Sequence, residues 1–170
     1  MTELRKSLVG HQRIAIDTNI FVYLLQHSEL YTEMAEAVFA WVKQPGHSAV
    51  VSTIVLTELL VPLYRQAGSI GHFLTGKLSS LDVLPYRAAG EESSSGLLML
   101  LATYANLEWI AADFGIADLA AQYRARYRLK TPDALHAATA VHSGATGFVT
   151  NDASFNRVEE FETLQFETLR

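Results

Sequence analysis

Short runs of β-branched and apolar residues alternate along this chain with longer segments of helical periodicity, and this alternation constrains the fold more than any other feature. The runs at 14–16, 49–51 and 148–150 are bounded by polar or turn-forming residues. The segments between them repeat apolar residues every three to four positions, as amphipathic helices do. Strands that alternate with helices are typical of βαβ units, whose parallel sheet is covered on both faces. The sequence therefore predicts the α/β class.

The same pattern places the individual elements. Strands are expected at 14–16, 49–51, 81–84, 148–150 and 164–167, and helices at 20–25, 31–43, 52–66, 97–112, 113–127 and 131–143. Ser52 and Asp113 are good N-cap residues, Thr131 is expected to cap a helix with Pro132 in its first position, and Gly144 is a suitable helix stop. These signals predict five strands joined by helices.

Length and composition favour one domain spanning residues 1–170. With 170 residues and 49% hydrophobic content, the chain is large enough for a substantial core. It contains no cysteine, which excludes disulfides and thiolate metal sites. The most apolar stretch, 97–112, is shorter than the roughly 20 residues that span a bilayer, so we expect a buried helix and no membrane contact. No basic start precedes an apolar leader segment, so a cytoplasmic location is expected.

Four carboxylates stand out because each interrupts or directly follows an apolar segment. Asp17 and Asp152 follow predicted strands, Glu58 lies within the apolar helix TIVLTELLVPL, and Asp133 lies in the first turn of a helix. Singly, these are explained as turn residues or as partners of a helix dipole. Together they predict a metal site, because carboxylates are rarely placed against a core unless they are paired or bind a metal. A site built only from oxygen ligands suits Mg²⁺ or Mn²⁺.

Four segments carry a resemblance to a known family. In order along the chain, IDTNIFVY, STIVLTELL, TPDALHAATA and TNDASF resemble the four motifs of PIN-domain nucleases, particularly the VapC-type toxins of bacterial toxin-antitoxin pairs. The resemblance spans nearly the whole chain. It implies a three-layer α/β/α sandwich with parallel strand order 3-2-1-4-5, a ribonuclease activity on RNA, a cognate antitoxin and a homodimer.

The resemblance also implies roles for individual residues. Asp17, Glu58, Asp133 and Asp152 would hold Mg²⁺ or Mn²⁺, while Thr18, Asn19, Thr150 and Asn151 would orient ligands, water or substrate. Such a metal lowers the pKa of a bound water and neutralises charge on the scissile phosphate, and four carboxylates allow either one metal or two. This assignment explains how a chain with a net charge of −5 could act on RNA, because bound cations reverse the local field.

A basic cluster precedes Asp133. Four basic residues fall within seven positions, and two aromatic residues are interleaved with them: Arg124, Arg126, Arg128 and Lys130, with Tyr123 and Tyr127. One interpretation is a rim that binds RNA phosphates and stacks unpaired bases on the rings. The alternative is a solvated helix end whose cations favour the negative pole of the helix dipole.

Other enzyme classes fit less well. The segment 71–77 matches most of a P-loop, but Leu78 replaces the required Ser or Thr and no strand precedes it, so nucleotide hydrolysis is rejected. Asp17 could suggest an aspartyl nucleophile, but Asn19 occupies the position of the second aspartate of haloacid-dehalogenase-like enzymes. We expect His136 to be a surface histidine on an alanine-rich helix rather than a metal ligand.

The competing class is a catalytically silent module of the same fold that binds RNA or serves oligomerisation. The presence of all four carboxylates favours the enzyme. The apolar surplus at 97–110 supports the expected homodimer. The segment 81–113 is longer than in typical toxins of the family, so the sequence leaves open both the antitoxin-binding surface and the choice between toxin and housekeeping nuclease.

Overall fold

A computed structural model describes residues 2–26, 28–65 and 104–169 of the chain. The described elements, in chain order, are α1 (Thr2–Val9), β1 (Arg13–Ile16), α2 (Thr18–Gln26), α3 (Thr32–Val42), β2 (Ser48–Ser52), α4 (Ile54–Arg65), β3 (Leu107–Ile110), α8 (Phe114–Tyr127), α9 (Thr131–His142), β4 (Gly147–Thr150), a short 3-10 helix η1 (Ala153–Arg157) and β5 (Glu162–Gln165).

The five strands form one parallel sheet in the order β3-β2-β1-β4-β5, which confirms the predicted order. β1 lies at the centre of the sheet, between β2 and β4. From β1, the chain first adds β2 and β3 on one side and then adds β4 and β5 on the other. The register sets Ala15 opposite Val50 on one side and opposite Phe148 on the other. The switch in strand order therefore falls between β1 and β4, where open parallel sheets commonly bind ligands.

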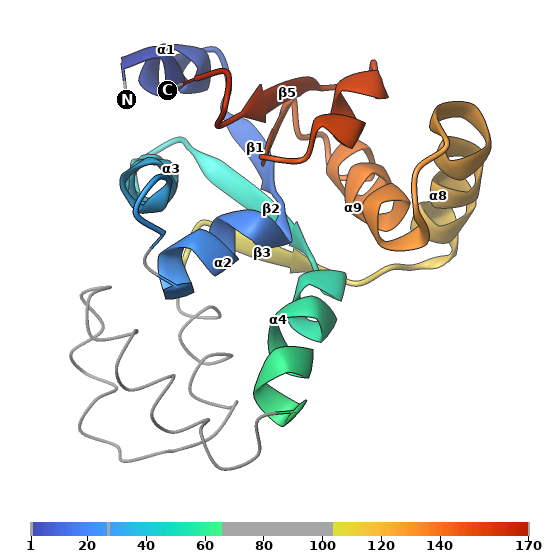
Figure 1. The fold of residues 1–170 in the computed structure, drawn as a ribbon. Helices are drawn as coiled ribbons and strands as arrows, with labels where there is room; N and C mark the ends of the chain where they lie inside the picture. Colours follow the sequence, from blue (N-terminus) through green and yellow to red (C-terminus); the bar gives the residue numbers. More distant parts are fainter. Residues whose placement is uncertain (1, 27, 66–103, 170) are drawn as a thin grey trace.

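Helices cover both faces of the sheet, which confirms the expected three-layer sandwich (Figure 1). Successive residues of a strand point to opposite faces. In β1, Ile14 and Ile16 pack into a core with α1, α2 and α3, whereas Ala15 packs into a second core with α8 and α9. In β4, Val149 packs into the first of these cores and Phe148 into the second. A strand buried on both faces reads as a continuous apolar run, which is why the central strands were predictable.

The edge strand β3 is a correction to the sequence-based prediction. A helix was expected over 97–112, but Leu107–Ile110 form a strand that pairs with β2. Within this strand Leu107 is buried and Glu108 is exposed. A continuous apolar run does not distinguish a buried helix from a strand, and the helical interpretation was therefore wrong for this part. The strand expected at 81–84 lies outside the described residues.

Other boundaries follow the cap signals, with exceptions at α1, α4 and α9. Asp113 caps α8 by accepting a hydrogen bond from Ile116 N at 2.8 Å, as predicted. Gly144 adopts a positive φ of 73° just after α9, where a residue without Cβ is favoured. However, Lys130 rather than Thr131 occupies the N-cap position of α9. Ser52, which was expected to cap a helix, is the last residue of β2, and α4 begins at Ile54. The helix α1 was not anticipated.

Arg13 fastens the edge strand to the rest of the sheet. Its guanidinium donates two hydrogen bonds of 2.7 Å to the carboxylate of Glu108 on β3, and a third of 3.2 Å to Ser48 Oγ on β2. Its Nε donates to Ser143 O, just beyond α9, at 2.8 Å. One side chain therefore connects three elements of the fold.

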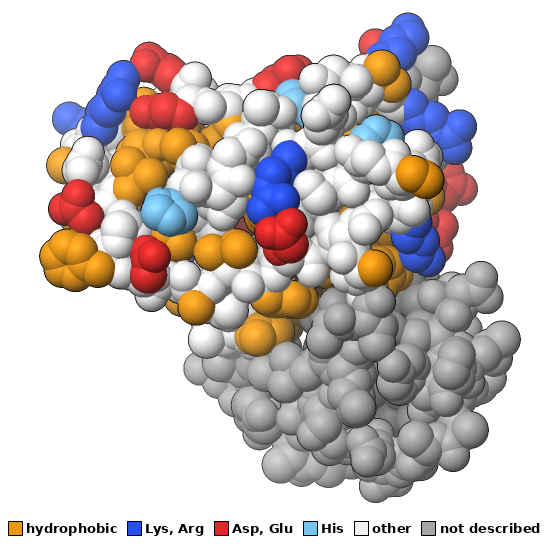
Figure 2. All heavy atoms as spheres, turned by 180° about the vertical axis from the view of Figure 1, so that it is seen from behind, with side chains coloured by type: hydrophobic (Ala, Val, Ile, Leu, Met, Phe, Trp, Pro, Cys, Tyr) orange, Lys and Arg blue, Asp and Glu red, His pale blue; other side chains and the backbone are white. Residues whose placement is uncertain are grey.

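Charged side chains are mixed over much of the surface. Figure 2 shows the side opposite to Figure 1, where basic and acidic side chains of the described residues are interspersed rather than gathered into one positive area. This distribution agrees with the acidic composition. Among the described helices, none is long and apolar enough to cross a membrane.

Candidate active site

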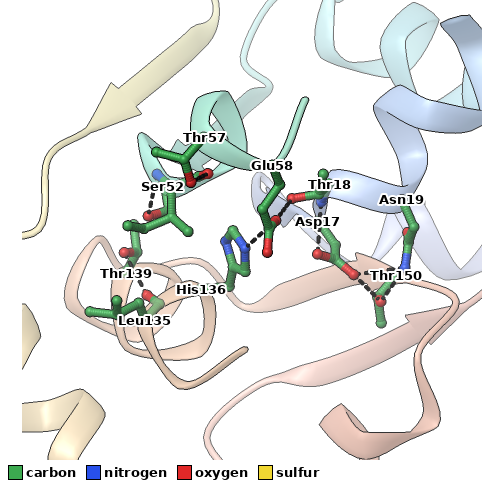
Figure 3. A network of polar contacts seen from close by, with 11 residues as sticks. Asp17, Thr18, Asn19, Ser52, Thr57, Glu58, Leu135, His136, Thr139 and Thr150 are labelled. Carbon is green, nitrogen blue, oxygen red and sulfur yellow. Dashed lines mark hydrogen bonds and ion pairs between the residues drawn. The ribbon is translucent and has the colours of Figure 1, made fainter. Parts of the chain in front are cut away.

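The four carboxylates come from four separate elements, two of which meet at the switch point of the sheet. Asp17 follows β1 and Asp152 lies just beyond β4, the strand beside it. The backbone N–H of Asp17 donates to Val149 O on β4 at 3.0 Å, which locks these two strand ends together. Glu58 comes from α4 and Asp133 from the first turn of α9. Figure 3 shows the polar contacts that connect these elements.

Asp17 is a buried carboxylate with a fixed orientation. It is only 7% exposed. Its Oδ2 accepts hydrogen bonds from Asn19 Nδ2 at 2.7 Å and from Thr150 Oγ1 at 2.6 Å, and its Oδ1 accepts from Thr18 N at 2.7 Å. Burial raises the pKa of Asp17 above its usual value, although the charge of His136 and the hydrogen bonds from Thr150 and Thr18 oppose the rise. The charge of Glu58 adds to it. A nearby cation would therefore stabilise the ionised form of Asp17.

Thr150 links three parts of the site. Its side chain is fully buried, at 0% exposure. Its Oγ1 donates to Asp17, accepts from Asn19 Nδ2 at 3.1 Å, and accepts from the backbone N–H of Asp152 at 3.0 Å. A single hydroxyl therefore sets the position of the Asp17 carboxylate relative to the start of the Asp152 loop.

Glu58 is held by two partners at one of its oxygens. Its Oε2 accepts a short hydrogen bond from Thr18 Oγ1 and lies 3.1 Å from His136 Nε2 (Figure 3). The contact with His136 lowers the pKa of Glu58 below its usual range, against the effect of burial. Its side chain is 35% exposed, whereas that of His136 is 3% exposed.

The burial of His136 overturns the expectation of a surface histidine. The alanine-rich helix around His136 predicted exposure, but α4 packs beside α9, and Glu58 of α4 contacts the imidazole. The spacing held a usable signal, because residues three apart on a helix share a face. His136 lies three positions after Asp133, so a functional face at Asp133 implies that His136 borders it.

Asp133, in the first turn of α9, and Asp152, just beyond β4, are the other two predicted site residues. Burial raises the pKa of Asp133, and the charge of Asp152 raises it further, with a smaller contribution from Glu58. The charge of Asp152 therefore acts on Asp133 although the two residues come from different elements. Asp152 also caps η1, since its Oδ1 accepts from Ser154 N at 2.8 Å.

The donor set fits a hard divalent cation. Asp133, Glu58 Oε1 and Asp152 Oδ2 accept no hydrogen bond from any other described residue, and Asn19 Oδ1 is buried without a partner. These are oxygen donors, which Mg²⁺ and Mn²⁺ prefer. In the described part of the chain, no three acidic or histidine side chains are already drawn together around one point. These oxygen donors thus lie on separate elements and are not gathered into a closed cluster in the described part of the chain.

Asn151 has a different environment from the neighbouring site residues. Its Nδ2 donates to the hydroxyl of Tyr23 on α2 at 3.1 Å, and its Oδ1 accepts from the backbone N–H of Glu167 at 3.1 Å. Both polar groups of the amide are thus engaged with α2 and the end of β5. In this structure Asn151 fixes the course of the loop that carries Asp152.

The basic cluster is exposed, but its aromatic residues are not. Arg124, Arg126 and Arg128 are all exposed near the end of α8. Arg126 is already paired with Glu159 at 2.6 Å and with Glu160 at 3.3 Å.

The interpretation in which bases stack on the two tyrosines of this cluster is wrong. Tyr123 and Tyr127 are 4% and 7% exposed, and both belong to the core under α8. Their spacing of four residues puts both on the inward face of the helix. Lys130 is the basic residue of this cluster whose charge reaches the site, since it opposes the rise in the pKa of Asp133.

The fold defines the class of this protein. Its open parallel sheet of order 3-2-1-4-5, flanked by helices, is that of an α/β protein, and Asp17 and Asp152 follow two adjacent strands at the switch point of this sheet. A family model described as the PIN domain matches residues 14–161, most of the chain. The chain therefore belongs to the PIN domain family.

Solved structures of similar fold are bacterial toxin-antitoxin proteins. The toxin-antitoxin complex from Klebsiella pneumoniae has a chain with a TM-score of 0.58 and 20% identity, covering 89% of this chain and 97% of that one. A chain of VapBC2 from Rickettsia felis, bound to a promoter DNA fragment, has a TM-score of 0.56 and 20% identity, covering 89% and 96%.

A third similar structure is VapC20 from Mycobacterium tuberculosis, described as a toxin that cleaves the sarcin-ricin loop. Its TM-score is 0.57 at 15% identity, covering 88% of this chain and 97% of that one. At such identities the likeness concerns the fold. No curated protein matches the sequence.

Proposed function

We propose that this PIN domain is a divalent-metal-dependent endoribonuclease and the toxin of a toxin-antitoxin pair. The observation that carries the proposal is the placement of Asp17 and Asp152 beyond the adjacent strands β1 and β4, with Glu58 tied to the same edge through Thr18. Asp133 is the fourth carboxylate of the proposal, and the charges of Asp152 and Glu58 raise its pKa. Crowded carboxylates are unfavourable by themselves and become favourable when a cation binds among them.

The residues of the site have separate tasks in this proposal. A bound Mg²⁺ or Mn²⁺ supplies an activated water and neutralises charge on the scissile phosphate. Asp17 binds the cation in a fixed orientation, because three hydrogen bonds hold its carboxylate. Asp133 and Asp152 bind with oxygens that no other described side chain engages. Lys130, next to Asp133, favours an approaching phosphate by its charge.

The partners proposed for the chain follow from its relatives. Two of the similar structures are toxin-antitoxin assemblies, so we propose a cognate antitoxin encoded beside this chain. The substrate is RNA, the protein acts in the cytoplasm, and a homodimer is the assembly expected for the family. The basic rim of Arg124, Arg126 and Arg128 contributes phosphate contacts outside the carboxylate cluster.

The central experiment compares wild type with Asp133→Asn in the cleavage of total cellular RNA, with Mn²⁺ or with EDTA. Asp133 is the natural choice because it accepts no hydrogen bond from the described residues, so the substitution should leave the fold intact. Asp118→Asn is the matched control, since Asp118 is exposed on α8 and accepts a side-chain hydrogen bond from Gln122 on the same helix. We expect Mn²⁺-dependent cleavage by wild type and the control, and none by Asp133→Asn with an unchanged circular dichroism spectrum.

Other outcomes discriminate between the alternatives. Undiminished cleavage by Asp133→Asn would exclude this site, and RNA binding by wild type without any cleavage would favour the silent module. The toxin assignment is tested separately by inducing the protein in bacterial cells with and without the adjacent reading frame. We expect growth arrest that the neighbouring gene relieves, and unaffected growth would favour a housekeeping nuclease.

A further inference from the structure

His136 is a buried polar residue that the sequence motifs do not place in the catalytic set. Its side chain is 3% exposed, yet it points into the site rather than into the apolar core (Figure 3). Burying a polar group lowers the stability of a protein unless that group makes a hydrogen bond. Here its Nε2 lies 3.1 Å from Glu58 Oε2, so the imidazole reaches across from α9 to α4.

Glu58 needs such a partner because its backbone alone does not fix its carboxylate. Glutamate has three side-chain torsions, and this one is 35% exposed, so several orientations are open to it. Two donors remove that freedom. Thr18 Oγ1 donates to Oε2 from the start of α2, and the Nε2–H tautomer of His136 donates to the same oxygen from α9.

The two contacts leave the carboxylate asymmetric. Oε2 receives both of them, whereas Oε1 accepts no hydrogen bond from another residue in the described part of the chain. An oxygen with two donors has few lone pairs left for a cation, whereas the other oxygen retains its full capacity. Protein groups behind a metal ligand generally set its orientation in this way.

We propose that His136 is a positioning residue, which together with Thr18 pins one oxygen of Glu58 and leaves the other as a one-oxygen ligand for the divalent ion. This inference rests on the proposed metal-dependent function and assigns a role within it. His136 does not itself bind the metal, because its Nε2 faces the carboxylate that does.

The experiment measures Mn²⁺ binding without RNA, by calorimetry and by the electron paramagnetic resonance of free Mn²⁺. His136→Leu removes the donor, whereas His136→Gln retains an N–H near the position of Nε2. His142→Leu is the control, because His142 is exposed at the far end of the same helix. Circular dichroism and melting curves in EDTA establish that each variant is folded.

We expect His136→Leu to weaken Mn²⁺ binding by roughly 10- to 100-fold, the usual effect of losing a partner of a metal ligand. His136→Gln should restore most of the affinity, and His142→Leu should match wild type. Thr18→Val should weaken binding too. Combined with His136→Leu, its effect should be less than the product of the two single effects, because both residues act on one oxygen.

Several results would overturn the inference. Wild-type affinity in His136→Leu would show that Glu58 needs no such partner. Nitrogen hyperfine coupling to Mn²⁺ that disappears in His136→Leu, with no rescue by His136→Gln, would make His136 a direct ligand. If wild type itself binds no Mn²⁺, the proposed function fails and this inference with it. If wild type binds Mn²⁺ and His136→Leu binds it equally well, the inference fails and the proposed function stands.

Discussion

Thr150→Val isolates the hydroxyl that joins Asp17 to the Asp152 loop. Valine has nearly the same shape as threonine, so the substitution removes hydrogen bonds from a fully buried position without opening a cavity. The bond of 2.6 Å to the Asp17 carboxylate is lost, and a buried charge is left with two partners instead of three. The N–H of Asp152 loses its partner as well, but Asp152 is exposed and water can replace it.

The expected magnitude follows from the loss at Asp17. A hydrogen bond to a charged group contributes about 1.5–3 kcal/mol, so we expect Thr150→Val to lower the free energy of unfolding by about 2–3 kcal/mol at pH 7 in EDTA. For a domain of this size the melting temperature should fall by about 4–12 °C.

The appropriate control is Thr139→Val. Thr139 is equally buried, at 1% exposure, but its hydroxyl donates to the carbonyl of Leu135 one turn earlier in the same helix. A bond of this kind contributes little to helix stability, so we expect a change below about 1 kcal/mol.

The pH dependence provides a second test of the same substitution. The bond from Thr150 lowers the pKa of Asp17 relative to the variant, so its contribution is present while Asp17 is ionised. It is lost as the pH falls through the pKa of Asp17 in the folded protein. The difference in urea stability between wild type and Thr150→Val should therefore shrink between pH 7 and pH 4. Equal losses in the two threonine variants, or a difference that does not change with pH, would refute the reasoning.

Three further predictions concern the charges around the site. The pKa values of Asp17 and Asp133 are raised in the folded protein, so their ionisation lowers the free energy of unfolding at pH values above their unfolded pKa of about 4. The metal-free protein should therefore become more stable as the pH falls from 7 towards 5. Urea unfolding in EDTA measures this change. Asp133→Asn removes a repelled charge without losing a described hydrogen bond, so it should melt about 2–4 °C above wild type in EDTA but gain less from added Mn²⁺. Replacing Arg124, Arg126 and Arg128 with Ala should flatten the salt dependence of RNA binding, with Arg126 contributing least because it is already paired, and an unchanged slope would favour a merely solvated helix end.

The sequence was most informative where local pattern and burial agree. Asp17 and Asp152 could be placed at the carboxyl edge because β1 and β4 are short apolar runs, and a strand buried on both faces has few other interpretations. β3 was missed for the complementary reason. Its four residues lie within a longer apolar stretch, and only the pairing with β2 decides that they form a strand.

The side-chain environments depended on contacts that no local pattern contains. His136 was expected at the surface, but it is covered by α4, an element more than 60 residues away in the sequence. One interpretation of the basic cluster placed Tyr123 and Tyr127 in an RNA-binding rim, yet helical geometry turns the neighbouring arginines outward and the rings inward. Interleaved residue types in a helix are therefore a poor guide to which of them share a surface.

The reach of Arg13 across the sheet has a consequence for how the fold opens. An edge strand usually frays first, and its amide hydrogens exchange with solvent independently of the rest of the protein. Here the separation of β3 from β2 must also break the two hydrogen bonds from Arg13 to Glu108. The same arginine donates a hydrogen bond to the carbonyl of Ser143. The amides of Leu107–Ile110 should therefore exchange in one unit with the last turn of α9. Arg13→Lys cannot form the paired hydrogen bonds to Glu108, so in this variant we expect the amides of β3 to exchange independently of those at the end of α9.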